Sequence, residues 1–204
     1  MEYRQVIELC KSGNLQELQH IIEQNPNYDI SALNEHAFRC ACEEGHLDVA
    51  KWLLQIKHDI DISAYYDEAF RRTCGNGHLD VAKWLLQIKP DIDISVLNEH
   101  TFRCACGNGH LDVAKWLLQI KPDIDISVLN EHAFRCACGN GHLDVAKWLL
   151  QIKPDIDISV LNEHTFRCAC ARGHLNVAKW LLQIKPDIHI SVRDDEAFQI
   201  GRAH

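Results

Sequence analysis

A repeat of 32 residues runs through nearly the whole chain, and this period constrains the fold more than any other feature. The units that begin at Leu97 and Leu129 differ only at Thr101 and Ala133. A period of 20–50 residues is typical of stacked arrays, in which each unit contacts only its neighbours. We therefore expect function to lie on an extended surface and not in a buried pocket. Glycines mark the same point in six successive units: Gly13, Gly45, Gly77, Gly109, Gly141 and Gly173.

Each unit has the pattern of two helices followed by a connection. In the unit 97–128, Asn98 is expected to cap a first helix, because Asn side chains accept bonds from free amides at helix starts. A second helix is predicted from about Leu111 to Ile120, and Pro122 prevents it from continuing. The alternating Asp and Ile residues of 123–127 predict an extended or hairpin-like connection.

The period also predicts the domain organisation, which is a single array over residues 1–204. Residues 1–32 form a capping unit with a polar outer side, and residues 193–204 begin a seventh unit without completing it. Two interpretations of this end stay open: Phe198 and Ile200 belong to a short capping helix, or the end mediates end-to-end self-association. The five full units are residues 33–64, 65–96, 97–128, 129–160 and 161–192.

The composition excludes several classes of protein. The net charge of −8 argues against a nucleic-acid binder, which needs a basic surface to follow phosphates. No apolar run approaches the 18 residues of a membrane span. The first residues lack the apolar segment of a secretory signal, and ten cysteines without such a signal indicate a reducing compartment. We therefore expect a cytoplasmic protein that contacts neither nucleic acid nor membrane.

The segment GHLDVAKWLL, at 109–118 and at matching places in other units, resembles the start and body of the second helix in ankyrin repeats. Asp123, Ile124 and Asp125 resemble the Ala-Asp-Val-Asn stretch of that family. The resemblance implies an all-α solenoid of stacked helix-turn-helix repeats with extended finger loops. The family's Thr-Pro-Leu-His opening is here replaced by residues 100–103, so the hydrogen bonds that it makes must be replaced as well. The 32-residue variant is similar to repeats of giant DNA viruses of amoebae, which implies the cytosol of a host cell.

The second full unit departs from the others, and internal differences show which positions the scaffold leaves free. Tyr65 and Tyr66 replace Leu-Asn before the first helix, and Arg72 replaces a cysteine. Tyr and Arg are over-represented in binding hot spots. Neutral drift among copied units is the competing interpretation. In ankyrin repeats the finger tips and first helices line the recognition surface. The resulting candidate partner-binding residues are Tyr65, Tyr66, Asp67, Arg72, Glu43, Glu44, Asn76 and Arg172.

Several further series recur with the repeat. Acidic residues stand four positions before Arg39, Arg71 and their equivalents, a spacing that predicts intrahelical ion pairs. The tryptophans at Trp52, Trp84 and equivalent positions are expected to pack between repeats. The cysteines of the Cys106 series are expected to be buried, whereas those of the Cys104 series align with Glu8 and Arg72 and are not expected deep in the core. The paired finger aspartates, such as Asp123 and Asp125, predict a preference for a basic partner surface.

Two kinds of chemistry are considered and set aside. Cys104, Cys106 and His110 resemble a set of zinc ligands. However, residues two positions apart on a helix point about 200° apart, so the thiols of Cys104 and Cys106 are not expected to face one metal ion. Catalysis requires a singular constellation of groups, whereas nearly every His, Cys, Asp and Glu here recurs with the period. We therefore expect that the chain has no enzymatic activity and binds neither a metal ion nor a cofactor. The sequence favours a non-enzymatic scaffold that binds a protein partner. The alternative is a self-assembling or purely structural repeat protein.

Overall fold

The computed structural model describes residues 3–26, 28–30 and 32–188, and within them the chain is all helical, with no strand. It divides into two compact units, Met1–Val96 and Leu97–His204, which are described separately. In the first unit the helices are α1 (Tyr3–Ser12), α2 (Leu15–Gln24), α3 (Ala32–Glu43), α4 (Leu47–Ile56), α5 (Ala64–Gly75) and α6 (Leu79–Ile88). In the second they are α7 (Val96–Gly107), α8 (Leu111–Ile120), α9 (Val128–Gly139), α10 (Leu143–Ile152), α11 (Val160–Ala171) and α12 (Leu175–Ile184).

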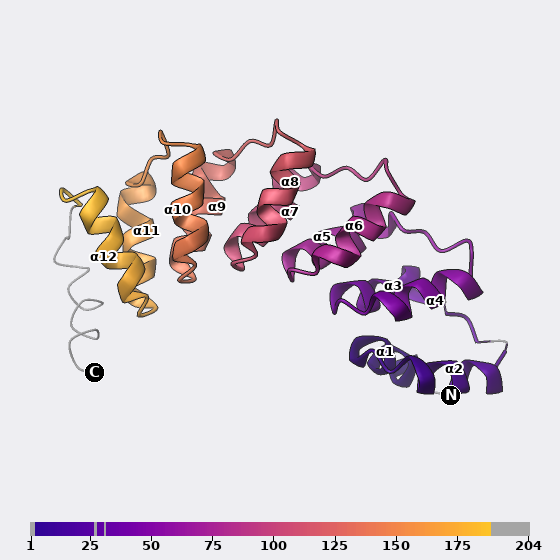
Figure 1. Ribbon diagram of the computed structural model, residues 1–204. Coiled ribbons are helices and arrows are strands. Elements are labelled where there is room, and N and C mark those ends of the chain that lie inside the picture. Colours follow the sequence, from indigo (N-terminus) through magenta and orange to yellow (C-terminus); the bar gives the residue numbers. More distant parts are fainter. Residues whose placement is uncertain (1–2, 27, 31, 189–204) are drawn as a thin grey trace. The chain divides into compact units, whose positions relative to one another are not determined.

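The helices are paired as the repeat predicts (Figure 1). First helices pack against the second helices that follow them, as α3 does on α4 and α9 on α10. First helices also pack on one another, with α3 between α1 and α5 in the first unit and α9 against α11 in the second. The predicted second helix, 111–120, is confirmed at both ends. The expected all-α repeat solenoid is therefore confirmed.

The core repeats along the chain because the same apolar side chains recur. Val113, Ala114 and Leu117 of α8 are fully buried, as are their equivalents in α4, α6 and α10. The tryptophans pack between repeats, as predicted. The rings of Phe38 and Trp84 lie 6.3 Å apart at a tilted angle, within the range of favourable aromatic pairs. Phe102 and Trp148 of the second unit have the same separation.

Close backbone approaches replace the hydrogen bonds of the missing ankyrin opening. The His46 ring lies against Gly13, and its Nε2 is 2.8 Å from the Lys11 carbonyl oxygen of the preceding repeat. Gly13 has a φ of +70°, and a side chain there would collide with the ring. In the irregular repeat, the Thr73 hydroxyl also donates to the buried Cys42 carbonyl oxygen at 2.9 Å. These bonds link the repeats 33–64 and 65–96 to the repeats before them.

The predicted cap at Asn98 is wrong, because the chain starts its first helices differently. Leu97, Asn98 and Glu99 are left-handed, with φ near +57°. Each left-handed residue other than glycine costs roughly 1–2 kcal/mol, so the turn needs support. Arg103 supplies it: its Nε donates to the Asn98 carbonyl oxygen at 2.8 Å and its Nη2 to that of Leu97 at 3.1 Å. Arg135 does the same for its own turn at 129–131.

The predicted ladder of intrahelical ion pairs is therefore wrong as well. The acidic residue of each pair lies in the left-handed turn, so it does not stand one helical turn before the arginine. Glu99 and Glu131 are buried there. The guanidinium groups of Arg103 and Arg135 bind backbone carbonyl groups instead. Arg39 forms its ion pair with Glu68 of the next repeat.

The finger loops consist of turns, without strands in the described residues. Their two aspartates both serve the loop. Asp123 pairs with Lys121 at 3.1 Å, and the Asp125 carboxylate accepts the Ser127 amide at 2.9 Å. The first aspartate is thus charge-compensated, which reduces the acidic edge expected to attract a basic partner. Phe198 and Ile200, on which the expectations about the C-terminal end were based, lie outside the described residues.

Candidate functional site

Tyr65 and Tyr66 lie in the left-handed turn at the start of α5. Their φ values of +57° and +58° match those of Leu97 and Asn98, so the tyrosine pair and the Leu-Asn pair support the same backbone. Tyr65 is 52% exposed and Tyr66 is 72% exposed. Two large aromatic rings therefore stand in solvent at a position where the fold does not require them.

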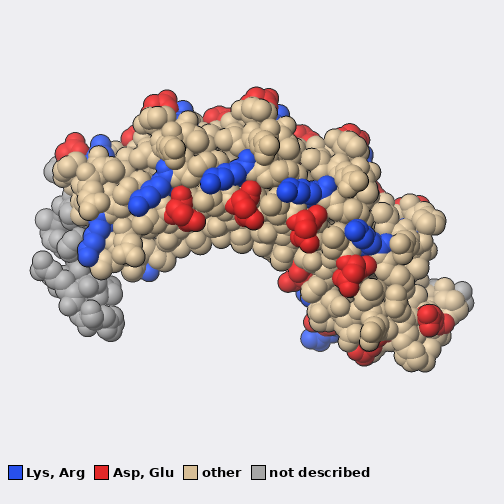
Figure 2. All heavy atoms as spheres, viewed as in Figure 1, with Lys and Arg blue, Asp and Glu red and all other residues tan. Residues whose placement is uncertain are grey.

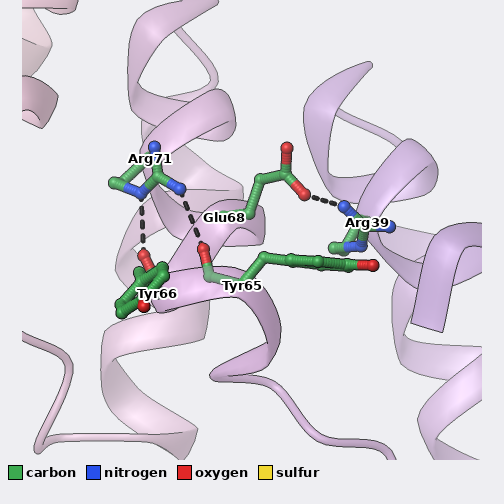
Figure 3. Close-up of a pocket in the computed structure, with 5 residues that line it drawn as sticks. All are labelled: Arg39, Tyr65, Tyr66, Glu68 and Arg71. Carbon is green, nitrogen blue, oxygen red and sulfur yellow. Dashed lines mark hydrogen bonds and ion pairs between the residues drawn. The ribbon is translucent and has the colours of Figure 1, made fainter. Parts of the chain in front are cut away.

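The two tyrosines line an open depression of about 450 Å³ together with Arg39, Glu68 and Arg71. Figure 3 shows the Tyr65 ring extended beneath Arg39, whose guanidinium carbon lies 4.7 Å from the ring centroid. Arg71 donates from Nε to the Tyr66 carbonyl oxygen at 2.7 Å and from Nη2 to that of Tyr65 at 2.9 Å. The turn and the Tyr65 ring are each held by an arginine, so the floor of the depression is fixed before any partner arrives.

Arg72 joins neighbouring first helices next to this depression. Its Nε donates to Glu68 at 2.7 Å within α5, and its Nη1 donates to Glu43 at the end of α3 at 2.8 Å. Asn76 donates to the Glu43 carbonyl oxygen at 2.9 Å. Three of the predicted residues, Glu43, Arg72 and Asn76, are thus in contact where α3 and α5 end.

The other predicted residues have different environments. Asp67 is buried, and its carboxylate accepts the Asp93 amide of the next finger at 3.4 Å, so it supports the turn from beneath. Glu44 is exposed at the end of α3. Arg172 belongs to the second unit, where it donates to the Gly139 carbonyl oxygen at 3.2 Å and to the Asn140 side chain. The structure therefore unites part of the predicted set and assigns Arg172 to a link between α9 and α11.

Sequence reasoning missed Arg39, Glu68 and Arg71 as members of the site. A signal for Glu68 was present, because Glu68 and Arg72 together replace the His and Cys found at these two positions in the other full repeats. In the regular repeats these residues also contact each other: the Cys136 sulfur lies 3.5 Å from His132 Nδ1. A joint replacement of two residues four apart on a helix indicates a direct contact between them.

The cysteines follow the two predicted series, with exceptions. Cys42, Cys74, Cys106 and Cys138 are buried, whereas Cys170 is half-buried. Cys104, Cys136 and Cys168 are half-buried as expected, but the prediction for Cys40 is wrong because it is buried. The long Arg72 side chain of the next repeat stands beside Cys40, where regular repeats place another small cysteine. Burial raises the pKa of the Cys136 thiol.

Within the described part of the chain, no three His, Cys, Asp or Glu side chains are grouped so that they could hold a metal ion. None of the described helices is long and apolar enough to cross a membrane. On the face shown in Figure 2, basic and acidic side chains lie next to each other over both units. This face does not carry the continuous basic stripe on which phosphate-tracking proteins rely.

Comparisons with known proteins agree with this architecture. One model, described as ankyrin repeats (3 copies), matches residues 101–194, and another, described as ankyrin repeats (many copies), matches residues 38–86 and 66–118. The crystal structure of the human ASB11 ankyrin repeat domain is similar, with a TM-score of 0.61 and 19% sequence identity over 88% of this chain and 83% of that one. No curated protein matches. At that identity the solved structure supports the fold alone. The family models, which together span residues 38–194, show that the chain belongs to the ankyrin repeat family.

Proposed function

We propose that this chain is a non-enzymatic scaffold that binds a protein partner through finger tips and first helices, with its main contact around Tyr65, Tyr66 and Arg72. Ankyrin repeats generally mediate protein–protein interaction, and no enzyme family is indicated by the comparisons. One observation carries the location of the contact. The Leu-Asn pair forms the same turn in other repeats, so stability does not account for two exposed tyrosine rings in this one.

The neighbouring residues have supporting roles in this proposal. Glu43 and Asn76 fix the end of α3 against α5, and Asp67 holds the turn to the next finger. Glu44 adds an exposed carboxylate at the edge of the site. Arg172 lies in the second unit and would contact a partner only through a separate surface.

We further propose that residues 1–204 act as one array, with the repeat boundaries given above, in a reducing cytoplasm. Ten cysteines are free thiols in the structure, which suits such a compartment. The similarity of the 32-residue variant to repeats of giant viruses supports the cytosol of an infected cell as the location.

The test is affinity capture from eukaryotic lysate with the parent chain and a Tyr65→Leu, Tyr66→Asn variant. This variant carries the residues that form the same turn at Leu97 and Asn98, so its fold is preserved, which circular dichroism would verify. A protein retained by the parent and lost by the variant supports the proposal. A protein retained equally by both would move the contact elsewhere on the array.

A second function, self-assembly, is favoured by a different observation. Leu97, Leu129 and Leu161 are each about half exposed at equivalent places in the second unit. A periodic row of apolar side chains offers a surface for a second copy. Light scattering at increasing concentration tests it: a mass that rises with concentration supports self-assembly, and a monomer throughout contradicts it. End-to-end association through residues 193–204 would produce the same rise, and truncation after residue 192 would abolish it.

A further inference from the structure

We infer that the surface formed by Tyr65, Tyr66 and Arg72 is built for an acidic segment of a partner protein, with a carboxylate seated against Arg72 and apolar groups against the two rings. This inference rests on the proposed function and specifies the chemistry of the partner. It differs from the basic partner expected from the finger aspartates, which the structure shows to be engaged within their own loops.

The charged groups of the site are layered, with the cation outermost. The Arg72 side chain is 50% exposed, whereas those of Glu43 and Glu68 are 24% and 15% exposed. Both carboxylates already accept hydrogen bonds from Arg72, and Glu68 is paired with Arg39 as well. A partner that approaches this surface therefore meets a guanidinium first, and carboxylates that are already neutralised behind it.

Arg72 also keeps unused hydrogen-bonding capacity. A guanidinium carries five N–H donors, and the two ion pairs engage one N–H on Nε and one on Nη1. The fork of donors matches a carboxylate, which accepts two parallel bonds. The two carboxylates beneath Arg72 hold it in one orientation, so a partner carboxylate would not have to order a mobile side chain.

The adjacent depression has the same sign of charge. Two arginines and one glutamate line it, and that glutamate is shared between Arg39 and Arg72. The Tyr65 and Tyr66 rings supply the apolar part of the surface, and their hydroxyl groups add donors. The net charge of −8 of the whole chain opposes an acidic partner at long range, but 0.15 M salt screens charges beyond about 8 Å.

The chain itself provides a matched control. Replacing residues 65–74 with the sequence of 129–138 requires Tyr65→Leu, Tyr66→Asn, Asp67→Glu, Glu68→His, Arg72→Cys and Thr73→Ala. This swapped variant keeps Ala69, Phe70, Arg71 and Cys74, and it carries a segment that already forms the same turn and helix elsewhere in the chain. Circular dichroism and thermal unfolding would establish that it is folded.

The experiment is selection of displayed random dodecapeptides on the parent chain in 0.15 M salt, with depletion on the swapped variant. We expect the retained peptides to be enriched in Asp and Glu. One peptide from this pool is then purified and labelled with a fluorophore. The Arg72→Gln variant of the chain should bind it about tenfold or more weakly than the parent does, because the substitution removes a charge-assisted bond. The same substitution exposes Glu43 and Glu68, so it should favour Lys-rich peptides in a repeated selection.

The outcomes separate the inference from the proposed function. Peptides that discriminate parent from swapped variant but are neutral or basic would overturn the acidic partner and leave the binding site in place. Peptides that bind both proteins equally, or no binding peptide at all, would contradict the location of the site as well as the inference. An Arg72→Gln chain that binds the acidic peptide as well as the parent does would remove Arg72 from the recognition surface.

Discussion

At the scale of single residues, glycine fixes the spacing between repeats. Gly45 has a φ of +81°, in the left-handed region that glycine enters without steric cost. A Cβ there would lie 2.4 Å from Nδ1 of His78, which belongs to the following repeat. The glycine therefore satisfies two requirements, a turn and a close contact, and these can be separated experimentally.

Gly141→Ala and Gly173→Ala form a matched pair for this purpose. Both glycines have positive φ, but a Cβ at Gly141 would collide with His174, whereas among the described residues no atom lies within 4 Å of a Cβ at Gly173. We expect Gly173→Ala to cost about 1–2 kcal/mol of unfolding free energy from the backbone alone, and Gly141→Ala to cost more. Urea unfolding of the two variants measures the difference. Equal losses would show that the imidazole moves aside without cost.

The buried carboxyl group of Glu131, in the left-handed turn of α9, links protonation to stability. Glu131 accepts a hydrogen bond from the Asp157 backbone, and its other oxygen is buried without a hydrogen-bond partner. Burial raises the pKa of Glu131 above its ordinary value of 4.5, with Asp155 and Asp125 acting in the same direction and Lys153 opposing them. The folded state thus binds the proton more tightly than the unfolded state does.

Glu131→Gln is therefore expected to stabilise the chain at neutral pH. The stabilisation contributed by the raised pKa is present in the parent below pH 4.5 and is lost as the pH rises through the folded pKa. The variant should consequently exceed the parent most at pH 7.5, and the difference should shrink towards pH 4.5. Urea unfolding across this range measures it. Asp155→Asn is the control, because pairing with Lys153 lowers the pKa of Asp155 below its ordinary value of 3.8, so the effect of this substitution should stay nearly constant over the same pH range. A difference between Glu131→Gln and the parent that stays constant with pH would contradict the prediction.

At the scale of helices, the residue that follows a first helix can form a hydrogen bond to the preceding repeat. Asn140 donates to the Gly107 carbonyl oxygen at 2.7 Å, and Asn76 donates to that of Glu43. Glu44 occupies this position in the first full repeat, and a carboxylate has no donor to offer the Lys11 carbonyl group. The contact between α1 and α3 therefore lacks a bond that the regular repeats have.

Glu44→Asn should restore this bond. We expect a gain of about 0.5–1.5 kcal/mol in unfolding free energy, the usual contribution of one hydrogen bond. Hydrogen exchange of α1 would show whether the gain is local, since contacts in repeat arrays act between neighbours. A Glu44→Asn chain with unchanged protection in α1 would exclude the bond.

At the scale of the whole molecule, the thiols fall into two classes of accessibility. Six cysteines are buried, and Cys104, Cys136, Cys168 and Cys170 are half-buried. Burial raises the pKa of the Cys10 thiol to about 12 and that of Cys106 beyond this, so these groups are almost never thiolates at pH 8.

Titration with a thiol-specific chromogenic disulfide should therefore be biphasic. The four half-buried thiols should react first, and the six buried ones only when urea unfolds the chain. Burial also raises the pKa of Cys136, so its reaction should accelerate as the pH rises above 8. A Cys106→Ser variant should leave the fast phase unchanged, whereas Cys136→Ser should reduce it. If all ten thiols of the folded chain reacted at the same rate, this result would contradict the burial pattern.

The sequence by itself determined the period, the family and the positions of the second helices. Those helices carry apolar residues at helical spacing between a glycine turn and, in four of the five full repeats, a proline after the helix, so local chemistry sets their ends. It also predicted Tyr65, Tyr66 and Arg72 as candidate binding residues, because they differ from the residues at the same positions in the other copies of the unit. Tertiary structure decided how first helices begin. Three left-handed residues are unfavourable in isolation, and the Arg103 side chain stabilises them by donating to two carbonyl groups of the turn.

Tertiary structure also decided which charged groups face solvent. Asp67 and Glu44 look equivalent in the sequence, yet Asp67 is buried under its turn and Glu44 is exposed. Partners such as Glu43 and Arg72 lie 29 residues apart and meet only because α3 and α5 are neighbours. A repeat period predicts that such neighbours exist. The direction and burial of each side chain depend on the packing of both helices at once, so they follow only from the folded array.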